Sequence, residues 1–185
     1  MTKALTGQIF LVICCIFYMI WWYRGYRPNV IVDRVGGVNG VLLMLTAAFG
    51  IIGVILTLFP IPKMIPLMFS QKLAVMIGIA AYILLLIVTR YGFGRIVTTE
   101  LFLIVGWTLL EMTLINRLYA GEFLQGRSFY LMCAVIAVAF IISMVLYVAY
   151  YRMEEMKAFY AAMVPLITEA LSMTVLICIL LSRRK

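Results

Sequence analysis

The chain has 185 residues, of which 66% are hydrophobic and only 12% are charged, and its formal net charge is +8. A soluble domain carries about 45–50% apolar and about 25% charged residues, so this composition excludes an ordinary soluble globular protein. The Lys and Arg residues lie singly or in short groups between apolar runs, where anionic headgroups attract them, and no basic stripe predicts a nucleic-acid partner.

Long apolar runs follow one another along the whole chain. Each of six segments is long enough to cross about 30 Å of hydrocarbon as a helix. The segments are residues 5–23, 39–59, 72–91, 98–119, 128–150 and 160–181. We therefore predict an all-α fold, a polytopic membrane helix bundle of about six transmembrane helices that forms a single integral membrane domain over residues 1–185.

The first segment ends in Trp21, Trp22, Tyr23 and Arg24. Aromatic rings prefer the headgroup level and the arginine resists translocation, so we expect an interfacial anchor and a segment that is retained as a membrane helix. Gln8, near the start of this segment, is expected at the membrane interface.

The second segment contains small residues, among them Gly50 and Gly53, which predict a close helix contact. A proline-rich apolar stretch, residues 59–69, then predicts an interfacial loop or a loop folded back against the bundle. In the third segment, Tyr82 offers a hydroxyl and a ring face either to a cavity or to packing.

Two carboxyl groups are predicted deep in the bilayer, Glu111 in the fourth segment and Glu169 in the sixth. At 1.5 Å per residue, Glu169 lies within ~3 Å and Glu111 within ~5 Å of the span midpoints. The two segments run in the same direction, so the carboxyl groups can line one cavity. No Lys or Arg lies at this depth. Each carboxyl group must therefore be protonated, reached by water, or paired with a cation that arrives.

Polar or helix-breaking residues accompany both carboxyl groups. Pro165, Glu169 and Ser172 recur on one helix face with Thr168 beside them, and Trp107 and Thr108 lie one turn before Glu111. The alternative interpretation is structural, with each Glu protonated and hydrogen-bonded to a neighbouring helix. The predicted substrate- or proton-binding residues are Glu111, Glu169, Thr108, Trp107, Thr168, Ser172, Pro165 and Tyr82.

Motifs for metal binding and catalysis are absent from the sequence. The chain has no histidine, and its four cysteines lie in apolar runs without metal-ligand spacing, so they are interpreted as packing residues. No phosphate-binding glycine loop or nucleophile motif occurs. We expect no metal, no cofactor and no enzymatic activity.

The leading hypothesis is a small membrane transport protein that binds a cationic or proton-coupled small solute in a midplane cavity through Glu111 and Glu169. The alternatives are a non-catalytic membrane subunit that captures a ligand or partner for a larger complex, and a narrow channel. Expected partners are membrane lipids and a small-molecule or ion substrate, and a homo-oligomer or a larger membrane complex stays open.

The expected location is a bacterial plasma membrane, with both termini cytoplasmic. That orientation follows from the basic cluster at residues 182–185, although Lys and Arg divide almost evenly between the two sides.

Overall fold

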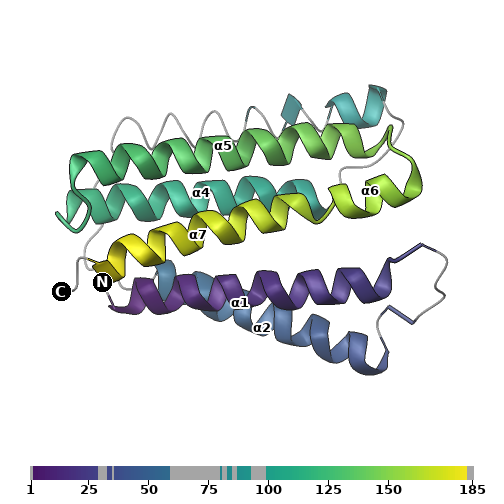
Figure 1. The fold of residues 1–185 in the computed structure, drawn as a ribbon, viewed down its shortest axis with the longest axis horizontal. Coiled ribbons are helices and arrows are strands. Elements are labelled where there is room, and N and C mark those ends of the chain that lie inside the picture. Colours follow the sequence, from purple (N-terminus) through teal and green to yellow (C-terminus); the bar gives the residue numbers. More distant parts are fainter. Residues whose placement is uncertain are drawn as a thin grey trace.

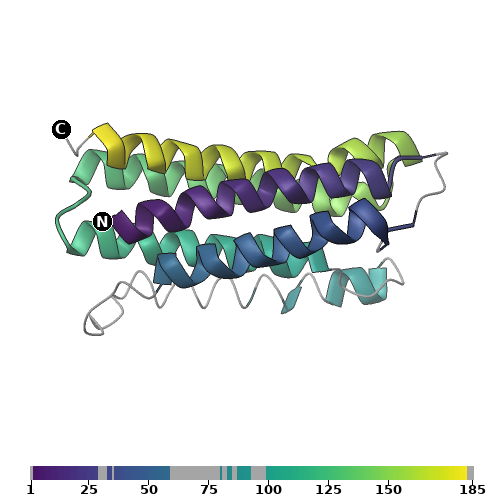
Figure 2. The ribbon, with the colours of Figure 1, turned by 90° about the horizontal axis from the view of Figure 1, so that it is seen from below.

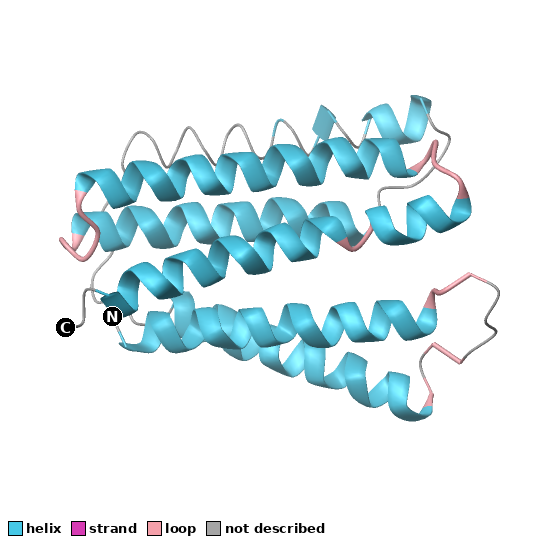
Figure 3. Cartoon of the chain, in the orientation of Figure 1, coloured by secondary structure: helices cyan, strands magenta, loops and turns pink. Residues whose placement is uncertain are grey.

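The computed structural model describes residues 2–28, 33–34, 36–58, 80, 83–84, 87–92 and 99–182. Within these residues the fold is all-α, with no strand (Figures 1 and 3). The helices are α1 (Thr2–Gly25), α2 (Gly37–Leu58), the short π-helix η1 (Val88–Gly92), α4 (Thr99–Ala120), α5 (Gly126–Tyr150), α6 (Glu155–Ala161) and α7 (Val164–Ser182).

Four helical stretches of the described chain are long and apolar enough to cross a membrane: Lys3–Gly25, Gly37–Leu58, Gly126–Tyr150 and Glu155–Ser182. They correspond to the first, second, fifth and sixth predicted segments. Helix α4 covers the fourth predicted segment but is not among the four, and it carries Glu100, Glu111 and Arg117. Most of the third predicted segment, including Tyr82, lies outside the described residues. The structure thus supports a polytopic helical membrane protein.

The long helices lie side by side along the longest axis of the molecule, and the two termini lie at the same end (Figures 1 and 2). Helix α1 contacts α2 and α7, and α5 contacts α4 and α7. A shared apolar core draws on α1, α4, α5 and α7. Its most buried members include Ile115, Met132, Ile136, Met173, Leu176 and Leu180. Helix α2 packs on the outside of this group, against α1.

The contact between α1 and α2 is close because glycines form it. A Cβ atom placed on Gly7 would lie 2.8 Å from the backbone nitrogen of Thr57 and 2.9 Å from the backbone oxygen of Gly53. A Cβ atom on Gly53 would lie 2.8 Å from Leu11 Cγ, and one on Gly50 would lie 3.2 Å from Cys14 Sγ. The close contact predicted at Gly50 and Gly53 is therefore confirmed, and Gly7 is its partner on α1.

Aromatic side chains gather where α1 approaches α6. Trp21 and Trp22 are both buried, and their indole N–H groups donate to the carbonyl oxygens of Arg34 (2.9 Å) and Phe159 (3.3 Å). We predicted an anchor in lipid headgroups at these two tryptophans. The prediction was wrong about their surroundings, because both rings pack against protein, with Tyr26 stacked on Trp22 at 4.3 Å.

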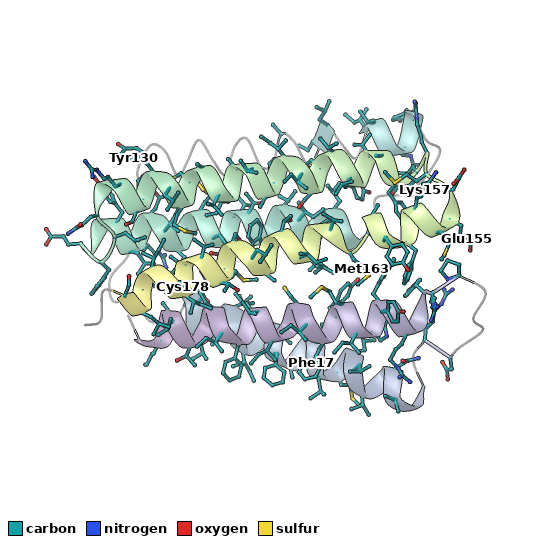
Figure 4. All side chains as sticks on the ribbon, in the orientation of Figure 1. Phe17, Tyr130, Glu155, Lys157, Met163 and Cys178 are labelled. Carbon is teal, nitrogen blue, oxygen red and sulfur yellow. The ribbon has the colours of Figure 1, made fainter. Side chains whose placement is uncertain are left out.

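The last membrane-length stretch is interrupted between α6 and α7. Helix α6 ends at Ala161, and α7 begins at Val164, so Pro165 occupies the first turn of α7. Proline fits there because residues in the first turn need no helical N–H donor. In an unbroken helix the N–H of residue 165 would bond to the carbonyl of Ala161, and proline has none to give. Figure 4 labels Met163 at this break.

Candidate functional site

Glu169 lies near the middle of the 28-residue stretch Glu155–Ser182 and is 4% exposed. Its side chain lines a pocket of about 100 Å³. The pocket is enclosed by α1, α4, α5 and the region of the α6–α7 break. The lining residues are Tyr18, Trp22, Leu103, Ile104, Leu146, Tyr147, Tyr150, Tyr151, Ala161, Ala162, Pro165, Leu166 and Glu169.

The lining of this pocket combines aromatic side chains with a single carboxyl group. Two rings come from α1, Tyr18 and Trp22, and three tyrosines come from the end of α5. Among the described residues that line it, none is Lys or Arg. The remaining wall is aliphatic, so the Glu169 carboxyl group faces rings and hydrocarbon.

The tyrosines at the end of α5 are held against one another. The Tyr151 hydroxyl donates to the Tyr147 hydroxyl at 3.0 Å, and their rings meet edge to face at 5.5 Å. Tyr150 meets Tyr151 in the same manner at 5.5 Å. Positions 147, 150 and 151 share one face of a helix, which places all three rings toward the pocket. The i, i+3, i+4 spacing of these tyrosines was a signal in the sequence for a common face.

The Glu169 carboxyl group is buried without a neutralising partner in the described part of the chain. Its Oε1 atom has no hydrogen-bond partner there. The Ser172 hydroxyl donates to the backbone oxygen of Glu169 (2.9 Å), not to its side chain. A buried ionised carboxylate costs several kcal/mol unless it is paired. The site therefore favours either a proton or a cation on this group.

Glu111 lies in a different environment, inside the shared core. It is completely buried, and Gln8 Nε2 donates to its Oε1 at 2.7 Å. Glu111 does not line the pocket.

Gln8 was missed as a core residue. We expected it at the membrane interface, and the structure contradicts this because the side chain is completely buried against Glu111. Two oxygen atoms of this pair, Gln8 Oε1 and Glu111 Oε2, have no partner in the described chain. A single amide inside an apolar segment was the available signal, because such side chains bond across membrane helices.

The other predicted site residues lie around the two carboxyl groups without joining the pocket, except Pro165. The hydroxyl of Thr108 donates to Ile104 O and that of Thr168 to Pro165 O, both at 2.8 Å within their own helices. Trp107 belongs to the shared core, and its Nε1 has no partner among the described residues. Tyr82 lies outside the described residues.

A second, outer hollow of about 390 Å³ adjoins the pocket at the end of the bundle formed by α6. The two share Trp22, Tyr150 and Tyr151. The outer hollow is lined further by Arg34, Tyr26 and Glu155, among others. Figure 4 shows Glu155 at this far end of the bundle, where α6 begins. The shared rings thus separate an outer chamber from the chamber that contains Glu169.

Within the described chain, no group of three or more His, Cys, Asp or Glu side chains is placed to hold a metal ion. The site therefore offers one carboxyl group and aromatic faces as its recognition elements. Comparisons with protein-family models, with curated proteins and with solved structures find no match to this chain.

Proposed function

We propose that this multi-span membrane protein is a small transport protein that binds a cationic solute at Glu169. One observation carries the proposal: a carboxyl group 4% exposed, with an unpartnered oxygen among the described residues, faces a pocket walled by five aromatic side chains. An incoming cation would offset the cost of the buried charge, and the ring faces would add attraction to it.

The proposed cycle exchanges a proton for the solute. The ionised Glu169 binds the cation, and protonation of the carboxyl group removes the charge that holds it. Cation binding is therefore expected to weaken as the pH falls.

The break between α6 and α7 supports a transport role. Transporters commonly place their substrate sites at interrupted helices near the bilayer midplane. Ala161, Ala162 and Pro165 at this break all line the pocket, and Glu169 follows one turn later. In the described chain, a ligand at Glu169 would therefore contact both halves of an interrupted stretch.

A ligand-capturing subunit of a larger complex is the second candidate. The observation that favours it is the packed core beyond the pocket, where Leu176 and Leu180 are completely buried toward the end at which the termini lie. A subunit that only captures the solute would bind it without moving it.

The test compares Glu169→Gln with Glu111→Gln, which replaces a buried carboxyl group that does not line the pocket. Binding would be measured by titration calorimetry, and flux in proteoliposomes, with ammonium, methylammonium, tetramethylammonium and guanidinium as probes. We expect Glu169→Gln to abolish both binding and flux, and Glu111→Gln to retain binding. Unchanged binding and flux in Glu169→Gln would refute the proposal, whereas binding without flux in the native protein would favour the capturing subunit.

A further inference from the structure

The wall of the Glu169 pocket also indicates which class of cation it takes. We propose that the solute is a small methylated quaternary ammonium ion of single positive charge. This inference rests on the proposed function and adds the identity of the ligand class.

The charge of the ligand follows from the charge of the wall. Glu169 is the one ionisable acid in the described lining, so it can balance one positive charge. No Lys or Arg in that lining would pair with an anionic group on the ligand. A zwitterion or a dication would leave a buried charge unpaired, which is costly in this setting. The wall therefore suits a monocation.

The methylation of the ligand follows from the aromatic and aliphatic lining. A primary ammonium buries three N–H donors, whereas most of the described lining is hydrocarbon. A quaternary ammonium has no N–H donor, and its methyl groups can lie against the rings of Tyr18 and Tyr150. Aromatic walls of this kind are the usual recognition device for quaternary ammonium ligands.

The size of the ligand follows from the size of the pocket. A volume of about 100 Å³ is well below the roughly 300–1,000 Å³ of pockets for drug-sized ligands. A small ion such as tetramethylammonium suits this space better than an ion with long alkyl chains.

The same aromatic stack already holds a cation of the protein itself. The Arg34 guanidinium lies over the Tyr26 ring at 4.4 Å, and Tyr26 stacks on Trp22 at 4.3 Å. Trp22 in turn lines both the outer hollow and the pocket. The Tyr26 ring thus holds a cation through its face, next to the Trp22 ring that lines the pocket.

The test is a methylation series with the purified full chain in lipid nanodiscs. Dissociation constants would be measured by calorimetry for ammonium, methylammonium, dimethylammonium, trimethylammonium and tetramethylammonium, with tetrabutylammonium as an oversized ion. We expect affinity to rise along the series, with tetramethylammonium at least about tenfold tighter than ammonium, and no binding of tetrabutylammonium.

Variants of Tyr150 test whether its ring face carries the preference. Tyr150→Leu is expected to reduce the preference for tetramethylammonium about fivefold or more, and Tyr150→Phe to retain it, because the ring and not the hydroxyl makes the contact. The matched control is Tyr130→Leu, on the same helix, where the ring is 70% exposed and does not line the pocket (Figure 4). This control should leave the series unchanged.

The outcomes separate the two proposals. If ammonium or guanidinium binds at Glu169 as tightly as tetramethylammonium, the ligand class is wrong and the cation site stands. If Tyr130→Leu and Tyr150→Leu change the series equally, the ring face is not the determinant, and the inference also fails. If none of the cations in the transport test or in the methylation series binds, both the ligand class and the proposed function are wrong.

Discussion

Gln8 and Glu111 lie 103 residues apart in the sequence, and their side chains meet in the core. The sequence alone predicted the depth of Glu111, because depth follows from its position along an apolar segment. It did not predict the partner, because the rotation of one helix about its axis decides which side chain faces another. The same reasoning applies to Glu169, whose depth was predictable and whose aromatic surroundings were not.

Replacement of Gln8 tests the buried pair at the residue scale. Gln8→Ala leaves the Glu111 carboxyl group without its donor, and an orphaned buried polar group costs about 1–3 kcal/mol. We expect a lower melting temperature in detergent, measured by fluorescence-detected unfolding. Glu111→Gln keeps an oxygen that can accept from Gln8 and should melt closer to the native protein. Equal melting of Gln8→Ala and the native chain would contradict a structural role for the bond.

At the scale of the elements, small residues decide how closely helices approach. The predicted glycines of α2 meet Gly7 of α1, a residue whose role required knowledge of the crossing point. The break between α6 and α7 was signalled in the sequence by Pro165, although the predicted segment 160–181 ran through it without interruption. A hydropathy window does not detect such a break, because the residues of segment 160–181 are apolar before and after it.

Gly7→Ala is predicted to destabilise the contact between α1 and α2. The added methyl group would meet backbone atoms of Thr57 and Gly53 that cannot move independently of α2. Overpacking of this kind costs about 1–3 kcal/mol, which should lower the melting temperature. The control is Gly106→Ala on α4, where the Cβ atom meets no described atom within 4 Å and the change favours the helix. If Gly106→Ala lowered the melting temperature and Gly7→Ala did not, the assignment of the close helix contact to Gly7 would be wrong.

Pro165→Ala is predicted to weaken cation binding while preserving the fold. Alanine supplies the N–H that proline lacks, so the carbonyl of Ala161 can be bonded and the helix can continue through the break. Ala161 and Ala162 would then move out of the positions from which they line the pocket. Calorimetric titration with tetramethylammonium should show a several-fold loss of affinity, with no loss of thermal stability. Retained affinity would show that the break does not shape the site.

At the scale of the whole molecule, four helices share one core and α2 lies outside it, against α1. The pocket lies toward the α6 end, and apolar packing fills the opposite end. No sequence pattern reveals this difference between the two ends of the bundle, because the residues that line the pocket come from four separate stretches of chain. The two ends are chemically different, with an aromatic chamber at only one of them in the described chain.

Cysteine labelling tests whether α5 spans the membrane between these ends. Arg127 lies at the start of α5 and Lys157 in α6, both exposed, and α5 between them has 25 residues, or about 37 Å. In intact cells an impermeant maleimide should label only one of Arg127→Cys and Lys157→Cys, and after permeabilisation it should label both. Both variants would be made in a background with the native cysteines replaced by serine, because Cys178 is exposed. Labelling of both variants in intact cells would contradict the crossing.

The sequence by itself indicated the setting of this protein, a helical, multi-span membrane chain, and it predicted two carboxyl groups deep in the bilayer. Those properties depend on composition and on position along the chain. The tertiary structure alone decided that Glu169 faces an aromatic pocket while Glu111 is bonded to Gln8 in the core. The reason is physical, because the environment of a buried side chain depends on which helix faces it, and that choice is made by packing between stretches far apart in the sequence.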